Sequence, residues 1–318
     1  MKVAQISVLA RISGNVNADE VIGTRITLKK MYSSSGEVLP FVSARAIKYA
    51  IRQALKEHKF DVDPFIENPD AEEALRLCDS GDPVKYIDND LFGYMVTLGR
   101  GKTARRRQGP IAFSYLKALR DTPIKSEFAA RFPRPWSKKL EENPVPFEVE
   151  VAEFIGKVNC LMNENIGIFE EIELKGKDEL KNNLLHREIN GKKVFMLDDK
   201  ERRKRIEAFL YVFLTPSYVL PRRTNSLNVP EYIAALIALS SRGPLPIYQY
   251  LTFDFDKNQI CIDGLKSLIA RPEISSNDTR FFLIDYTNRL ESSIPEKIEM
   301  ISVSKVIDKI SKFFAVTN

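Results

Sequence analysis

The segment DNDLFGYMVTLGRGKTARRRQGPIAFSYLKALRD, residues 88–121, differs most from the composition of the rest of the chain. No acid occurs between Asp90 and Asp121, whereas an even spread of the 43 acids over 318 residues would put about four there. Five bases fall close together among small residues: Arg100, Lys102, Arg105, Arg106 and Arg107. Such a segment can place several guanidinium groups on phosphates, which favours a nucleic-acid-binding loop. A solvated basic loop without a ligand is the alternative.

One motif in this segment is incomplete. Gly101-Lys102-Thr103 resembles the end of a phosphate-binding P-loop, but that loop requires a glycine where this sequence has Val96. The sequence therefore does not predict a nucleoside triphosphatase.

The composition limits the class of protein. A chain of 318 residues that is 44% hydrophobic can bury a large core, and its net charge of +5 means that nucleic-acid affinity must come from clustered bases. Cys78, Cys160 and Cys261 are far apart and only two histidines are present, so we predict no metal, no cofactor and no disulfide framework. No apolar run reaches the ~18 residues of a membrane span. We expect a cytoplasmic protein without a membrane partner.

The spacing of apolar residues predicts an α+β fold, because some segments alternate with period two and others recur every three or four residues. The expected strands are 2–12, 146–155, 232–239 and 281–285, and the expected helices are 43–57, 199–214 and 303–314.

We expect one elaborated domain over residues 1–318 that carries three insertions. The first, 59–89, is acidic and broken by prolines and glycine. The second, 121–146, has several prolines around Trp136 and is predicted to be an irregular connection. The third, 165–198, contains two apolar arms, 166–174 and 192–197, that favour an extended hairpin or a projecting loop.

The helix expected at 43–57 has a basic edge. Ser43 can cap it, and its core stripe is Ile47, Ala50, Ile51, Ala54 and Leu55. Arg45, Lys48 and Arg52 recur at intervals of three and four, which places them along one side of the helix. The helix has no acid before Glu57, so this row has no internal partners. A solvated face is the alternative to an anionic ligand.

Several ordered motifs resemble a known family. They are a strand at the start of the chain, LPFVSARAIKYAIRQ at 39–53, NDLFGYM at 89–95 with the arginine-rich loop after it, and LPRRTNSLNVP at 220–230. Together they resemble the RAMP superfamily of CRISPR-associated proteins, and within it the backbone subunit of type I Cascade surveillance complexes (the Cas seven group, DevR-like branch). The resemblance covers most of residues 1–120 and 200–240.

The resemblance implies an RRM-like, ferredoxin-type βαββαβ core with large insertions, described as palm, fingers and thumb. It also implies copies that stack head to tail along a CRISPR RNA, contact other Cascade subunits and support pairing with a target DNA strand in antiviral defence. Because base pairing reads the sequence, such a subunit needs charge and shape rather than contacts to base edges. The residues predicted to bind RNA are Arg25, Lys29, Lys30, Ser43, Arg45, Lys48, Arg52, Arg100, Lys102, Arg105, Arg106, Arg107, Arg222 and Arg223.

The resemblance also bears on catalysis. Related backbone subunits of type III complexes cut RNA with an aspartate in the loop after the first strand, where this sequence has Thr24 or Arg25, with Asp19 and Glu20 a few residues upstream. Neither threonine nor arginine acts readily as a base, so we predict a binding subunit that is not an enzyme. The alternatives are a RAMP-type endoribonuclease that cuts target RNA and a basic RNA-binding protein unrelated to CRISPR.

Overall fold

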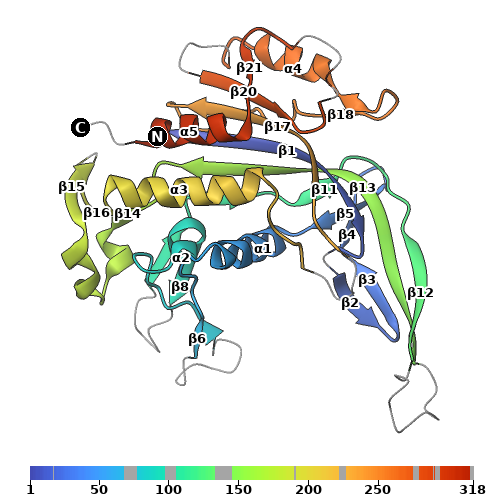
Figure 1. The fold of residues 1–318 in the computed structure, drawn as a ribbon, viewed down its shortest axis with the longest axis horizontal. Coiled ribbons are helices and arrows are strands. Elements are labelled where there is room, and N and C mark those ends of the chain that lie inside the picture. The colour runs from blue at the N-terminus through green and yellow to red at the C-terminus, as the bar shows by residue number, and fades with distance from the viewer. Residues whose placement is uncertain are drawn as a thin grey trace.

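A long mixed sheet runs through the molecule (Figure 1). The computed structural model describes residues 1–16, 18–67, 77–96, 105–132, 145–189, 191–221, 227–274, 279–288, 290 and 294–315. In these ranges the sheet has 12 strands, and its main path runs in the order β21-β20-β17-β1-β13-β11-β5-β4. The strands on this path are β21 (Ile298–Met300), β20 (Thr279–Asp285), β17 (Glu231–Ser240), β1 (Val3–Gly14), β13 (Val145–Asn163), β11 (Leu116–Ala118), β5 (Val38–Val42) and β4 (Lys30–Tyr32), and those beside it are β2 (Ala18–Ile22), β3 (Arg25–Leu28), β10 (Ile111–Phe113) and β12 (Lys125–Arg131).

The centre of this sheet has the ferredoxin-like connectivity. In chain order β1, α1 (Ala44–Glu57), β11, β13, α3 (Asp199–Leu214) and β17 form a βαββαβ unit, whose strands lie in the order β17-β1-β13-β11. All neighbours in this unit are antiparallel, and β1 pairs with β13 from Val3 opposite Asn163 to Gly14 opposite Ala152. The predicted α+β fold with an RRM-like core is confirmed.

Helices cover both faces of the sheet. The side chains of α1, α3 and α5 (Val303–Phe314) pack against one face, and α4 (Ile262–Ile269) lies on the other (Figure 1). Because side chains alternate along a strand, β1 sends Ile6 and Val8 toward α1 and α3, and Leu9 toward α4. The helices predicted at 43–57, 199–214 and 303–314 are confirmed, and so are the strands predicted at 232–239 and 281–285.

Smaller elements flank the core. They are the sheet β14 (Ile168–Glu170), β16 (Lys192–Met196) and β15 (Leu185–Ile189), the pairs β6 (Ile66–Glu67) with β7 (Leu77–Cys78), β8 (Gly93–Val96) with β9 (Arg105–Gln108) and β18 (Phe253–Asp254) with β19 (Gln259–Ile260), the helix α2 (Ile87–Phe92), and 3-10 turns at Glu171–Leu174 and Asp178–Asn183. The two arms predicted within 165–198 do pair, as β14 with β16, and β15 adds a third strand.

The prediction of an irregular connection at 121–146 was wrong for its first part. β12 is a regular strand that pairs with β13 from Lys125 opposite Val151 to Arg131 opposite Val145. Most of its side chains are exposed, so it lacks the alternating apolar pattern from which a strand is predicted. Together with the first half of β13 and with β2 and β3, it extends away from the rest of the molecule (Figure 1). Residues 133–144 lie outside the described ranges.

The carboxylate of Asp90 joins α2 to three other segments. It is fully buried and accepts hydrogen bonds from Arg107 Nη2 on β9 at 2.7 Å and from Arg205 Nη1 on α3 at 2.9 Å. The backbone N–H of Gly167 donates to it at 3.0 Å. Arg107 also pairs with Glu173 at 2.9 Å. Two cations and a peptide N–H therefore compensate one buried negative charge.

The Leu91-Phe92-Gly93 motif next to Asp90 is explained by packing. Leu91 and Phe92 belong to the main hydrophobic core. Gly93 has a φ of 80°, a backbone conformation that other residues rarely adopt, and a Cβ there would collide with the carbonyl oxygen of Arg107. Only glycine therefore lets β9 lie so close to the end of α2.

We expect Asp90→Asn to lower the free energy of unfolding by about 3–5 kcal/mol, because it removes the fully buried carboxylate that Arg107 and Arg205 share. Urea unfolding followed by circular dichroism measures this change. Asp263→Asn is the matched control, since the side chain of Asp263 is 88% exposed on α4, and it should change stability by less than about 0.5 kcal/mol. A loss below about 1 kcal/mol for Asp90→Asn would contradict the role assigned to this charge.

Candidate nucleic-acid interface

The helix α1 presents the basic edge that the sequence predicts. Ser43 caps it, since its Oγ accepts a hydrogen bond from the N–H of Ala46 at 3.2 Å. The predicted core stripe is buried, whereas Arg45 is exposed. No acid lies in the first turn, so the positive end of the helix dipole is not neutralised from within the helix.

The next two members of the row rest on the ring of Phe92. Lys48 Nζ lies 5.5 Å and Arg52 Cζ 5.2 Å from its centroid. Arg52 Nε also donates to the buried carboxylate of Asp88 at 2.9 Å, so part of its charge is compensated. Burial lowers the pKa of Lys48, and the nearby Arg52 lowers it further. Among the described residues no carboxylate pairs with Arg45 or Lys48, so these two charges remain available to a ligand.

The prediction that Arg105 and Arg107 contact RNA was wrong. Alternate residues of β9 point inward, and Arg105 and Arg107 are only 4% and 5% exposed. Arg105 donates to the carbonyl oxygens of Ser80 and Lys175, and Arg107 binds Asp90. Arg106, between them, is exposed and stays a predicted RNA contact. Arg100 and Lys102 lie outside the described residues.

Buried arginines also occur at the start of α3. Arg202 donates to the carbonyl oxygen of Ile166 at 2.9 Å, and Arg205 donates to that of Pro83 at 2.7 Å. Both side chains point inward, whereas Arg203 and Lys204 are exposed. Half of this basic run therefore holds the fold together rather than facing a ligand.

The cations of β3, of β4 and of the residue between them are paired with acids. Arg25 lies 3.2 Å and Lys30 3.0 Å from Glu150 on β13, and Lys29 lies 3.0 Å from Asp19 on β2. Burial alone would raise the pKa of Glu150, but a hydrogen bond from a backbone N–H and the two cations outweigh it, and the pKa lies below its ordinary value. These three cations stay predicted RNA contacts with reduced free charge. Arg222 and Arg223 lie outside the described residues.

The loop considered above for an RNA-cutting aspartate lies between β2 and β3, on the part of the molecule that extends outward with β12. Thr24 is in the turn between β2 and β3, and Asp19 on β2 carries Lys29 as its partner. In the described ranges no group of three or more histidine, cysteine or acidic side chains could hold a metal ion. None of the helices described in the structure is long and apolar enough to cross a membrane.

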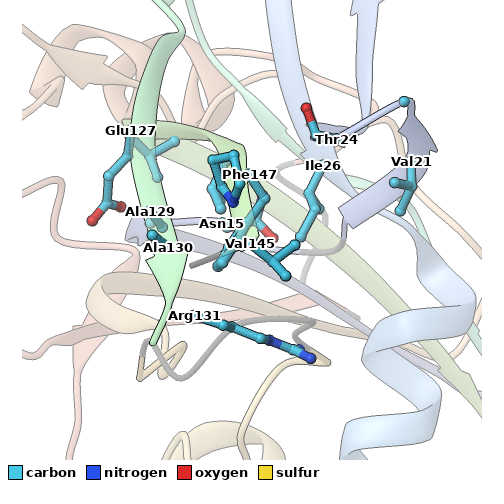
Figure 2. A pocket seen from close by; sticks show the side chains of 15 residues that line it. Asn15, Val21, Thr24, Ile26, Glu127, Ala129, Ala130, Arg131, Val145 and Phe147 are labelled. Atoms are coloured by element: carbon cyan, nitrogen blue, oxygen red, sulfur yellow. The ribbon is translucent and has the colours of Figure 1, made fainter. Parts of the chain in front are cut away.

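A groove of about 810 Å³ lies between the β2–β3 hairpin and the paired strands β12 and β13. Figure 2 shows Ile26, Val145 and Phe147 gathered in it, with Arg131 at its margin. The lining is mainly apolar, so the groove does not suit a phosphate backbone. It suits an apolar group of a partner better.

Comparison with known protein families shows which family this chain belongs to. Residues 7–254 match the family described as CRISPR-associated negative auto-regulator DevR/Csa2. The chain belongs to this family. A search of the curated proteins finds no match to this sequence. The motifs at 39–53 and 89–95 that carry the predicted resemblance lie inside the matched range, and the predicted DevR-like branch is confirmed.

Two solved structures share the fold of this DevR/Csa2 protein. One, titled "CRISPR RNA-guided surveillance complex", has a TM-score of 0.60 at 13% identity and covers 98% of each chain. The other, titled "CRISPR RNA-guided surveillance complex, pre-nicking", has a TM-score of 0.62 at 14% identity and covers 98% of this chain and 99% of that one. At this identity the similarity concerns the fold.

Two features of this DevR/Csa2 chain were missed in the sequence. The ring of Phe92 under Lys48 and Arg52 joins residues forty or more positions apart, and no local pattern signals that contact. The buried arginines of β9 did have a signal. Arg105 and Arg107 stand two apart, as inward residues of a strand do, and buried acids precede them in the same segment.

Proposed function

We propose that this DevR/Csa2-family chain is a CRISPR RNA-binding backbone subunit of a type I Cascade surveillance complex. The observation that carries the proposal is the cationic edge of α1, where no carboxylate of the described residues pairs with Arg45 or Lys48, on a fold shared with structures titled as RNA-guided surveillance complexes. Copies of the chain stack head to tail along the guide, contact other Cascade subunits and support its pairing with a target DNA strand in antiviral defence. The three cysteines are unpaired, which supports a cytoplasmic location; cell fractionation would test it.

In this proposal α1 holds the guide through its backbone. The N-terminal end of α1, Arg45 and Lys48 follow one another along the helix, so successive phosphates can each meet a positive group. These groups contact no base edges, which leaves the bases free to pair with a target. Arg52 contributes less, because Asp88 already neutralises part of its charge.

The projection made by β12 and β13 is the proposed thumb. Phe128 on its outer face is 73% exposed, and Val145 on its groove face is 62% exposed. Exposed apolar side chains on a projecting hairpin indicate a partner surface. A neighbouring copy of this chain is the partner that head-to-tail stacking supplies, and an asymmetric contact of this kind builds open filaments.

Arg45→Gln together with Lys48→Gln should weaken RNA binding equally for guides of different sequence. Two lost phosphate contacts should reduce the slope of log affinity against log salt by about 1.4, since each contact to a single strand contributes ~0.7. Fluorescence anisotropy with labelled RNA at several salt concentrations measures both effects. Lys266→Gln on α4 is the control, and it should leave the slope unchanged. An effect that depended on base identity and not on salt would refute the proposed binding mode.

RNA of increasing length should assemble complexes whose mass grows in steps of one ~36 kDa subunit. Phe128→Ser should shorten these assemblies without changing binding of one subunit to a short RNA. Mass photometry measures the steps. Met300→Ser removes an apolar side chain of 47% exposure elsewhere and serves as the control. A closed dimer whose mass is independent of RNA length would exclude head-to-tail stacking.

We also infer that the chain does not cut RNA. At the loop position used by type III relatives it has Thr24 and Arg25, and the carboxylate of Asp19 already binds Lys29. Assembled complexes given complementary RNA and Mg²⁺ should leave that RNA intact on a denaturing gel. Regularly spaced cuts that disappear with Asp19→Ala would instead establish the endoribonuclease alternative.

A further inference from the structure

The sheet face opposite α1 carries a row of side chains that the proposed guide site does not use. Phe41 on β5, Lys117 on β11 and Lys157 on β13 lie directly opposite one another across three strands. Lys157 is also opposite Leu9 of β1, which packs on the α4 side, so the row belongs to that face. The ring of Tyr115 lies 5.0 Å from that of Phe41 and the residue is 50% exposed.

The two lysines of this row are an unfavourable pair for stability alone. Like charges directly opposite in a sheet repel each other. Lys157 turns its ammonium group to the carbonyl oxygens of Tyr248 at 2.7 Å and Leu251 at 3.2 Å, while Lys117 stays exposed. Burial lowers the pKa of Lys157, and Lys117 lowers it further. No carboxylate among the described residues pairs with either lysine, and the exposed ammonium group of Lys117 is open to an external anion.

The chemistry of this face limits the classes of ligand that could bind it. An exposed aromatic ring near Lys117, which has no carboxylate partner among the described residues, offers a stacking surface for a base and a positive group for its phosphate. The carboxylates of an acidic protein segment could pair with a lysine, but they would not stack on the exposed ring of Tyr115. We propose that this face binds single-stranded nucleic acid, with a base on Tyr115 and a phosphate at Lys117. The site is separate from the α1 edge, so it goes beyond the proposed function and does not depend on it.

A tryptophan at position 115 tests the stacking contact. Trp136→Phe removes the chain's one natural tryptophan, and Tyr115→Trp then makes the emission report on this face alone. Titration with a 12-nucleotide oligothymidylate should quench this emission and saturate. Adding Lys117→Gln should reduce the slope of log affinity against log salt by about 0.7. Adding Arg45→Gln and Lys48→Gln should leave the quenching midpoint unchanged, because those residues lie on the other face.

Tyr211→Trp in the Arg45→Gln, Lys48→Gln chain is the matched control, since Tyr211 is 49% exposed on α3 and should show no quenching once the α1 edge no longer binds. Absence of quenching at position 115 would overturn the proposal. Equal quenching by a polyglutamate peptide would instead assign the face to an acidic protein, and loss of quenching with Arg45→Gln and Lys48→Gln would show a single shared site.

If Tyr115→Trp does not fold, as judged by circular dichroism, anisotropy with labelled oligothymidylate in the Arg45→Gln, Lys48→Gln chain replaces it. There Tyr115→Ala should weaken binding at least about fivefold. Unchanged binding would refute the site.

Discussion

The buried charge of Asp90 is the constraint on which the other contacts near α2 depend. A carboxylate without exposure to water is strongly unfavourable unless opposite charges and hydrogen bonds compensate it. Arg107 from β9, Arg205 from α3 and the N–H of Gly167 supply that compensation. These groups come from segments far apart in the chain, so the requirement of one side chain determines how α2, β9 and α3 are placed.

The same short helix supports the proposed guide-binding edge. Asp88, two residues before Asp90, receives Arg52, and Phe92, two residues after it, lies under Lys48 and Arg52. Contacts with α2 thus support the basic edge of α1, and the ion pairs of Asp90 fix the position of α2. Flexible lysine and arginine side chains lose less entropy on binding a phosphate when an aromatic ring already restricts them.

Arginine has two roles in this chain, and burial separates them. Arg107, Arg202 and Arg205 use their several N–H donors to satisfy carboxylates and carbonyl oxygens inside the fold. Arg45 and Arg106 face water. The number of basic residues in a segment therefore overstates the charge that a nucleic acid can reach. The same holds for apolar residues, because Phe128 on the long β12–β13 projection is exposed and is not part of the core.

The sequence by itself determined the α+β class, the core helices with Ser43 as the cap of α1, and the central strands, because periodicity and capping are local properties. It also indicated the cationic row of α1, whose members are neighbours on one helix. Tertiary structure alone decided which acid pairs with each buried arginine and that Glu150 compensates Arg25 and Lys30. It likewise decided that Phe41, Lys117 and Lys157 share one face. Charge compensation and strand pairing join residues far apart in sequence, and the pattern of one segment does not contain its partner.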